Sequence, residues 1–262
     1  MRVVAIIQAR VQSTRLPGKV LLPLKQQPAV NHVIERLSFC SKVNDTVLAV
    51  PDDHENNVLR KLALSAGVDY SAGPMDDVLE RYLIAIAAYD ADIIVRVTGD
   101  SPLICPYLAD LTVEALLEGD NDYAVMKGAP LGTEAEVVKR EAFQELGRLA
   151  DSPEMREHPT LAIHNNREHF KIKIVKPPES YNHTEYRLTL DTKQDYIVLK
   201  SIYDNVAPVQ GFIHLPDVFT YLAAHPEVAS LNRDVEQRMH GFLASSKEAI
   251  ADAGHENRTP RD

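Results

Sequence analysis

The sequence contains little cysteine and opens on only a short apolar run. Its two cysteines, Cys40 and Cys105, lack CxxC spacing and form no cysteine-rich framework. This usage is typical of a reducing compartment and predicts neither a zinc site nor a disulfide. The first apolar run, Val3 to Ile7, has five residues, which is too few for a signal sequence or a membrane span. We therefore expect a cytoplasmic protein that does not contact a membrane.

Several common motifs of nucleotide-binding proteins and hydrolases are missing too. No GxG occurs, which excludes the dinucleotide and protein-kinase fingerprints, and the P-loop pattern GxxxxGK[ST] is absent. The zinc-protease pattern HExxH and the nucleophile elbow GxSxG are likewise absent. Any phosphate-binding or catalytic site must therefore be built from other residues.

The charge is unevenly distributed along the chain. The 262 residues carry a net charge of −10, which argues against nucleic-acid binding because nucleic-acid binders usually carry a basic face. The first 34 residues nevertheless contain no acidic residue and carry +5, so the other 228 carry −15. A basic patch on an acidic protein suggests a focused site for a small polyanion, although a solvated basic loop without a ligand would have the same composition.

Short apolar runs alternate with amphipathic segments through the first half of the chain. This alternation predicts a mostly parallel sheet with helices on both faces, in a single α/β domain over residues 1–245. The expected strands are 3–7, 46–50, 68–70 and 92–97, and the expected helices are 29–38, 56–66, 76–89 and 107–118. In such sheets, ligands bind beyond the carboxyl ends of the strands, where the strand order reverses.

The second half of the chain has a different pattern. Short strands and a polar helical stretch rich in His and Arg occupy residues 121–186, which we expect to form a small inserted layer rather than an independent domain. A further strand is expected to begin at Tyr186 and to end in an acidic turn, followed by a helix over 194–205. The polar residues 246–262 are expected to form a flexible tail.

The loop over residues 9–19 carries the groups that phosphate binding requires, which are fixed cations, hydroxyls and a close approach of the backbone. These groups come from Arg10, Arg15, Lys19, Ser13, Thr14 and Gly18. The loop is therefore a candidate anion site, and a solvated basic turn is the alternative.

Two acidic residues follow expected strands. Asp100 lies in the loop TGDSP, and Asp191 begins the acidic turn DTKQD. An aspartate after a strand is commonly a turn former or a helix cap. Magnesium, however, binds through one or two carboxylates together with substrate phosphates and water. If the two aspartates meet beside the basic loop, they predict a metal–triphosphate site.

The run ARVQSTRLPGKVL resembles the signature ARxxSxRLPGK of the cytidylyltransferases that make CMP-Kdo and CMP-sialic acid, in particular the branch typified by spore coat polysaccharide biosynthesis protein F. Further similar segments follow in order within residues 2–205: DDVLERY, VRVTGDSPLI, GTEAEVV, MREHPT and RLTLDTKQDY. The resemblance implies a three-layer α/β/α sandwich of the GT-A-like type, the nucleotide-diphospho-sugar transferase fold. It also implies a homodimer that uses CTP and Mg²⁺.

The resemblance also implies roles for individual residues. The positions that match the nucleotide-binding loop of the family are Arg10, Ser13, Arg15 and Lys19. Asp100 matches the metal-binding aspartate, and Asp191 matches the second carboxylate on the metal side. Arg81 and Arg96 match polar positions near the nucleotide or the sugar. The expected catalytic residues are Arg10, Lys19, Asp100 and Asp191.

The sequence departs from the family pattern within residues 121–186, which we take as the candidate region for sugar binding and dimer formation. Glu134 stands where the branch usually has Asp, and Pro159 stands where Val is typical. Neither change removes a charge from the basic loop or from the two aspartates. Both therefore bear on the identity of the sugar more than on the type of reaction.

The resulting hypothesis is a magnesium-dependent cytidylyltransferase that transfers CMP from CTP to a small acidic sugar, Kdo- or nonulosonate-like, and releases pyrophosphate during the synthesis of a polysaccharide or surface glycan. A glycosyltransferase of related architecture would consume a nucleotide-sugar and commonly carries DxD, where this loop reads TGDSP. A sugar-1-phosphate nucleotidyltransferase would carry a GxGTR-type loop, which is missing. A catalytically silent binding module is the third alternative, although an idle site need not keep the full set of charged residues.

Overall fold

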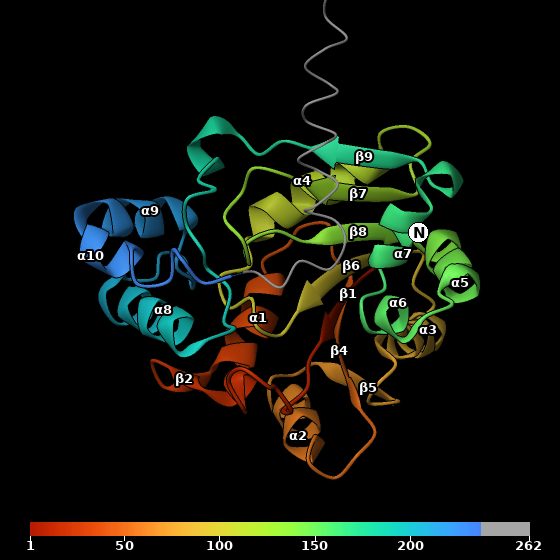
Figure 1. The fold of residues 1–262 in the computed structure, drawn as a ribbon, viewed down its shortest axis with the longest axis horizontal. Coiled ribbons are helices and arrows are strands. Elements are labelled where there is room, and N and C mark those ends of the chain that lie inside the picture. Colours follow the sequence, from red (N-terminus) through yellow and green to blue (C-terminus); the bar gives the residue numbers. More distant parts are fainter. Residues whose placement is uncertain (237–262) are drawn as a thin grey trace, which may run out of the picture.

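Seven strands form one central sheet in the computed structural model, which describes residues 1–236 (Figure 1). Their order across the sheet is β5-β4-β1-β6-β8-β7-β9. The strands are β1 (Val3–Gln8), β4 (Asp45–Pro51), β5 (Asp69–Gly73), β6 (Ile93–Thr98), β7 (Tyr123–Met126), β8 (Glu136–Lys139) and β9 (Ile172–Val175). β8 runs antiparallel to both of its neighbours, and the other pairs are parallel. The predicted mostly parallel sheet is therefore confirmed.

Helices cover both faces of this sheet. They are α1 (Ala29–Leu37), α2 (Asn57–Ser65), α3 (Val78–Ala88), α4 (Pro106–Leu117), α5 (Arg140–Leu149), α6 (Pro153–Glu157), α7 (Leu161–Asn165), α8 (Lys193–Asn205), α9 (Leu215–Ala224) and α10 (Pro226–Ala229). A small hairpin, β2 (Pro23–Leu24) with β3 (Gln27–Pro28), precedes α1. One apolar core joins α1, α2 and α4 to the sheet, and a second joins α3, α5 and α7 to its opposite face. The three-layer sandwich predicted from the sequence is thus confirmed.

Alternate residues of β1 pack on opposite faces of the sheet, which explains why a strand buried on both faces reads as a continuous apolar run. Val4 and Ile6 pack in the core beneath α3, whereas Ala5 and Ile7 pack in the core beneath α1, and all four are fully buried. The strand order reverses beside β1, because β4 and β5 lie on one side of it and β6 on the other. The loops that leave β1 and β6 therefore diverge at this point and leave room for a ligand.

Residues 121–186 extend the same sheet. They supply β7, β8 and β9 and the helices α5, α6 and α7 (Figure 1). Their proposed part in sugar binding and dimer formation stays a prediction. No helix among residues 1–236 is long and apolar enough to cross a membrane. The tail expected at 246–262 lies outside the described residues.

The prediction of a strand that starts at Tyr186 is wrong. The structure contains only an isolated bridge there, between Leu131 and Arg187. The backbone of this segment bonds to two loops instead, since Leu188 N donates to Leu131 O at 2.9 Å and Leu190 N donates to Asp100 O at 2.8 Å. The alternating pattern was real, but the segment lies across the carboxyl end of the sheet and has no strand beside it with which to form a ladder.

A third apolar cluster anchors this segment. Leu103, Leu188 and Leu190 are buried against α8 and α9, which lie on the left of the sheet in Figure 1. The loop after β6 and the segment that carries Asp191 therefore share one core. This shared packing holds Asp100 and Asp191 at a constant spacing, as a rigid scaffold should for a chemical site.

Candidate active site

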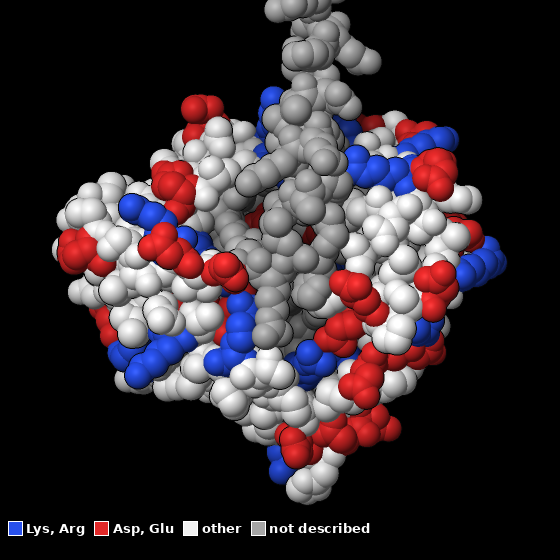
Figure 2. Space-filling view, in the orientation of Figure 1, with Lys and Arg blue, Asp and Glu red and all other residues white. Residues whose placement is uncertain are grey.

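A cavity of about 680 Å³ opens at the carboxyl ends of β1 and β6. Its wall includes all eight residues singled out from the sequence, namely Arg10, Ser13, Arg15, Lys19, Arg81, Arg96, Asp100 and Asp191. In Figure 2, Lys and Arg side chains gather near the centre of the face shown, and Asp and Glu side chains follow its right and lower margin. Residues far apart in the sequence are therefore brought together at one place.

Lys19 forms the centre of this arrangement. Its Nζ lies 2.5 Å from Asp100 Oδ2 and 2.7 Å from Asp191 Oδ1. Burial acts to lower the pKa of Lys19, but the attraction of the two carboxylates outweighs it, and the pKa lies above its ordinary value. Lys19 is therefore charged at neutral pH, with two carboxylates directed at one point.

Two arginines complete the charge balance at Asp191. Arg15 Nη2 lies 2.9 Å from Asp191 Oδ1, and Arg187 Nη2 lies 2.8 Å from Asp191 Oδ2. Burial acts to raise the pKa of Asp191, but Lys19, Arg15 and Arg187 outweigh it and hold the pKa below its usual range. Asp191 is therefore an ionised, partly dehydrated carboxylate, which is the state required of a metal ligand.

Local backbone geometry explains the shape of the basic loop. Gly18 adopts φ 67°, which favours glycine, and its N–H donates to Val11 O at 3.0 Å. Val11 N in turn donates to the side chain of Asn56 at 2.9 Å, and Asn56 is itself fully buried. The loop is thus closed on itself and tied to the start of α2, which directs Lys19 into the cavity.

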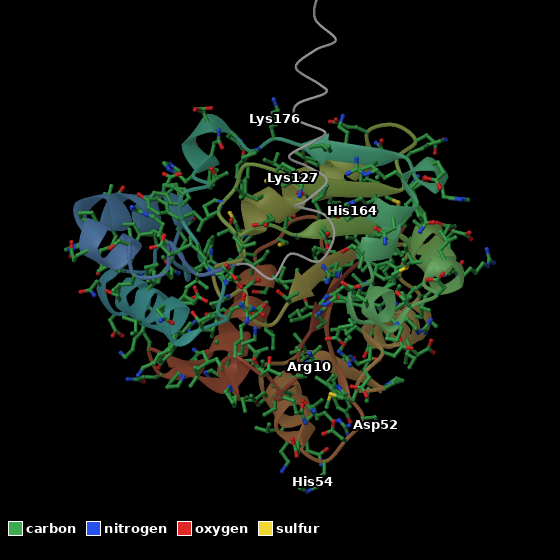
Figure 3. All side chains as sticks on the ribbon, viewed as in Figure 1. Arg10, Asp52, His54, Lys127, His164 and Lys176 are labelled. Carbon is green, nitrogen blue, oxygen red and sulfur yellow. The ribbon has the colours of Figure 1, made fainter. Side chains whose placement is uncertain are left out.

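Arg10 points to a different partner. Its guanidinium lies 2.8 Å from Glu157 of α6. In Figure 3, Arg10 lies in the lower half of the molecule, whereas Lys127 and His164 lie in its upper half. Arg10 thus lines the cavity with Glu157 as its ion-pair partner, and its nucleotide-binding role remains a prediction.

Arg81 and Arg96 are held by internal partners. Arg81 Nη1 donates to the carbonyls of Pro74 and Met75, each at 2.7 Å. Arg96 pairs with Glu136 across β6 and β8, where the two residues are register partners. Both guanidiniums therefore shape the cavity wall, and the structure adds no direct support for their predicted contact with nucleotide or sugar.

Sequence reasoning missed Arg187 and Asp195, which both contact Asp191. Asp195 is fully buried and accepts hydrogen bonds from Arg187 Nε at 2.9 Å and from Asp191 N at 3.0 Å. It also forms a capping box with Thr192 at the start of α8. The alternation of buried Leu188 and Leu190 with polar neighbours was the available signal, because it turns Arg187 and Asp191 to the same side.

Sequence reasoning singled out Glu134 but missed the other polar residues in the part of the cavity beyond the aspartates. This part is lined by Lys127, Glu134, Glu136, Thr160 and His164. They come from the ends of β7 and β8 and from α7, all within residues 121–186. Their positions follow from strand register, which a single sequence does not display.

The donor set around Lys19 suits a divalent cation. Two carboxylates, Asp100 and Asp191, both contact the Lys19 ammonium, and magnesium binds through one or two carboxylates with substrate phosphates and water. Among residues 1–236, no group of three or more His, Cys, Asp or Glu side chains could hold a metal by itself. Phosphate oxygens and water would therefore have to supply the remaining ligands, as expected for a metal that arrives with a nucleotide.

Comparisons with known proteins point in the same direction. A family described as Cytidylyltransferase matches residues 4–239. The spore coat polysaccharide biosynthesis protein SpsF of Bacillus subtilis is 33% identical over 86% of this chain and 95% of its own length. A 3-deoxy-manno-octulosonate cytidylyltransferase of Geobacter metallireducens is 36% identical over 45% of each chain.

A solved structure agrees with both the fold and the family. The structure of a cytidylyltransferase from Leptospira borgpetersenii superimposes with a TM-score of 0.81 at 30% identity. The superposition covers 91% of this chain and 100% of the other. The similarity therefore extends over most of this chain.

Proposed function

The chain belongs to the cytidylyltransferase family, and we propose that it transfers CMP from CTP to a small acidic sugar and releases pyrophosphate. One observation carries this proposal: Lys19 of the basic loop contacts both Asp100 and Asp191 inside one cavity. The same place thus offers cations for a triphosphate and carboxylates for a metal. The family relationship supports CTP as the nucleotide.

The basic loop would hold the triphosphate. Arg10, Arg15 and Lys19 all line the cavity, so their charges can neutralise the β- and γ-phosphates. The hydroxyls of Ser13 and Thr14, which also line the cavity, add donors of the kind that phosphate oxygens accept. Holding the leaving pyrophosphate in this way stabilises the charge that develops as it departs.

Asp100 and Asp191 would hold Mg²⁺. When bound, the metal screens the repulsion between two anionic substrates and makes a coordinated hydroxyl more acidic. The rigid packing beneath Asp191 keeps both carboxylates in place before the substrates arrive. The chain itself then contributes orientation and charge stabilisation, while the acceptor hydroxyl attacks the α-phosphorus in line with the departing pyrophosphate.

The acceptor would lie in the part of the cavity formed by residues 121–186. Lys127 places an ammonium in this wall, which suits an acidic sugar. SpsF is named as a polysaccharide biosynthesis protein and the Geobacter relative as a 3-deoxy-manno-octulosonate cytidylyltransferase, and both names support a sugar acid in glycan synthesis. Homodimer formation stays a prediction of the family resemblance, and a cytoplasmic location stays a prediction from the cysteine usage and the short first apolar run.

A pyrophosphate-release screen tests the proposed function. Four nucleoside triphosphates are crossed with a panel of acidic sugars, with Mg²⁺ or with EDTA. We expect release only where CTP, an acidic sugar and Mg²⁺ are all present. Tight binding of CTP without any turnover would indicate a silent module, and consumption of a nucleotide-sugar would indicate a glycosyltransferase.

Replacement of Lys19 tests the triphosphate assignment. Lys19→Ala is expected to weaken the use of CTP by about 2–3 kcal/mol, because a charge-assisted contact with phosphate is lost at a partly dehydrated site. The measurement is kcat/KM for CTP from initial rates of pyrophosphate release. Lys25→Ala removes an exposed lysine of the same basic segment and should leave kcat/KM unchanged. Equal values for the two variants would remove Lys19 from the nucleotide site.

A further inference from the structure

Glu134 lies on a short segment that is fastened to both aspartate-bearing loops. Thr133 O accepts a hydrogen bond from Cys105 N at 2.8 Å, on the loop that follows Asp100. Leu131 O accepts from Leu188 N at 2.9 Å, on the segment that leads to Asp191. The carboxyl group of Glu134, which lines the cavity, is therefore positioned by the same backbone that positions the two candidate metal ligands.

The contact at Gly132 shows how closely the segment that carries Glu134 packs against the segment that leads to Asp191. Gly132 adopts φ +91°, and a Cβ at this position would lie 2.7 Å from the backbone nitrogen of Thr189. Only glycine allows the two backbones to touch here. Glu134 follows two residues later and Asp191 two residues after Thr189, so both side chains leave from one tightly packed junction.

The sheet register identifies the charged groups that face Glu134. Val125 of β7 pairs with Glu136 of β8, and Lys127 and Glu134 each lie two residues beyond that pair, on the same face. Glu134 Oε2 accepts from Thr133 N at 3.1 Å, which orients the carboxyl group. Glu134 thus has Lys127 and Glu136 as its charged neighbours.

Burial and these neighbours together set the pKa of Glu134. Burial raises its pKa to about 7, opposed by the backbone N–H groups of Glu134 and Thr133 and by Lys127, while Glu136 adds to the rise. Glu136 itself is held ionised, since Arg96 and the Tyr123 hydroxyl outweigh its burial and lower its pKa. Lys127 has its pKa lowered to about 8 by burial. A carboxyl group that titrates near neutral pH is suited to proton transfer.

We propose that Glu134 is the general base that takes the proton from the attacking hydroxyl of the acceptor, a role that rests on the proposed function. In this step the acceptor O–H bond breaks and its oxygen forms a bond to the α-phosphorus of CTP. The bond from the α-phosphorus to the bridging oxygen of the β-phosphate breaks, and pyrophosphate leaves. The proton remains on the Glu134 carboxylate until water removes it after the product has departed.

The pH dependence of turnover tests this role. For the intact protein with saturating CTP, acidic sugar and Mg²⁺, kcat is expected to rise about tenfold per pH unit below pH 7 and to level off above it. Glu134→Gln should lower kcat about 100-fold and abolish the rising limb, because the amide accepts no proton. The Kd of this variant for CTP, measured by calorimetry, should stay within about twofold of the original value, since residue 134 lies outside the triphosphate loop of residues 9–19.

Two further variants make the test decisive. Glu134→Asp keeps a carboxylate and should restore both the limb and much of the rate, which a merely structural role would not require. His158→Gln removes the imidazole of another residue in the cavity wall and should keep the limb. Loss of the limb in His158→Gln, or an unchanged limb in Glu134→Gln, would overturn the assignment while leaving the proposed function intact. Absence of turnover in the unmodified protein would instead overturn the proposed function.

Discussion

Asp100→Asn is expected to keep its fold and to lose catalysis by at least about a thousand-fold. Asp100 lies in the cavity wall, 2.5 Å from the ammonium of Lys19. The amide has the same shape as the carboxylate but lacks the charge that a divalent cation requires. A bound metal contributes several kcal/mol of charge stabilisation to the transition state, and each 1.36 kcal/mol is a factor of ten in rate. The measurement is pyrophosphate release at saturating CTP and acceptor.

The control for Asp100→Asn is a matched change away from the cavity. Asp52 is exposed and pairs only across the surface with Arg60, near the lower tip of the molecule in Figure 3. Asp52→Asn should leave turnover unchanged, and circular dichroism of both variants should match the unmodified protein. Turnover of Asp100→Asn near that of Asp52→Asn would show that Asp100 is a turn former without a role in the reaction.

Asp195→Ala is expected to lower the free energy of unfolding by about 3–5 kcal/mol. Asp195 is fully buried and binds Arg187, the backbone N–H groups of Asp191 and Thr192, and the side chain of Asn232. Its removal leaves donors without their acceptor inside the protein and also ends the capping box of α8. The measurement is urea unfolding followed by circular dichroism, with the midpoint and slope fitted together.

Asp204→Ala provides the matched control on the same helix. Asp204 is exposed and pairs with Lys200 one turn earlier, and exposed pairs of this kind contribute at most about 1 kcal/mol. The contrast between the two variants isolates the effect of burial from that of helix composition. An Asp195→Ala variant as stable as Asp204→Ala would show that the buried network does not support the segment that carries Asp191.

Local patterns were sufficient to predict the strands β1, β4, β5 and β6 and the helices α1, α2, α3, α4 and α8. The run Val3–Ile7 predicted β1, and the helix expected at 76–89 is α3, which Asp77 caps by accepting from Glu80 N. The family resemblance is confirmed by the match over residues 4–239. These features depend on neighbours in sequence, which is why composition, periodicity and motif matching found them.

Long-range partners were not predictable from those patterns. The segment from Tyr186 reads as a strand, yet its backbone bonds to loops near Leu131 and Asp100. Arg96 lines the cavity, and its guanidinium pairs with Glu136, a partner that follows only from strand register. Partners of this kind depend on which strands lie side by side, and one sequence does not contain that information in readable form.

The central claim is that one pocket binds both the triphosphate and its metal. The most direct test is a crystal structure of the protein with CTP and Mg²⁺. We expect the β- and γ-phosphates over residues 10–19, and the metal bound by Asp100 and Asp191, with the Lys19 ammonium on phosphate oxygens. Nucleotide density elsewhere, such as the hollow beside His54 and Tyr70, with Lys19 still paired to both aspartates, would contradict the account.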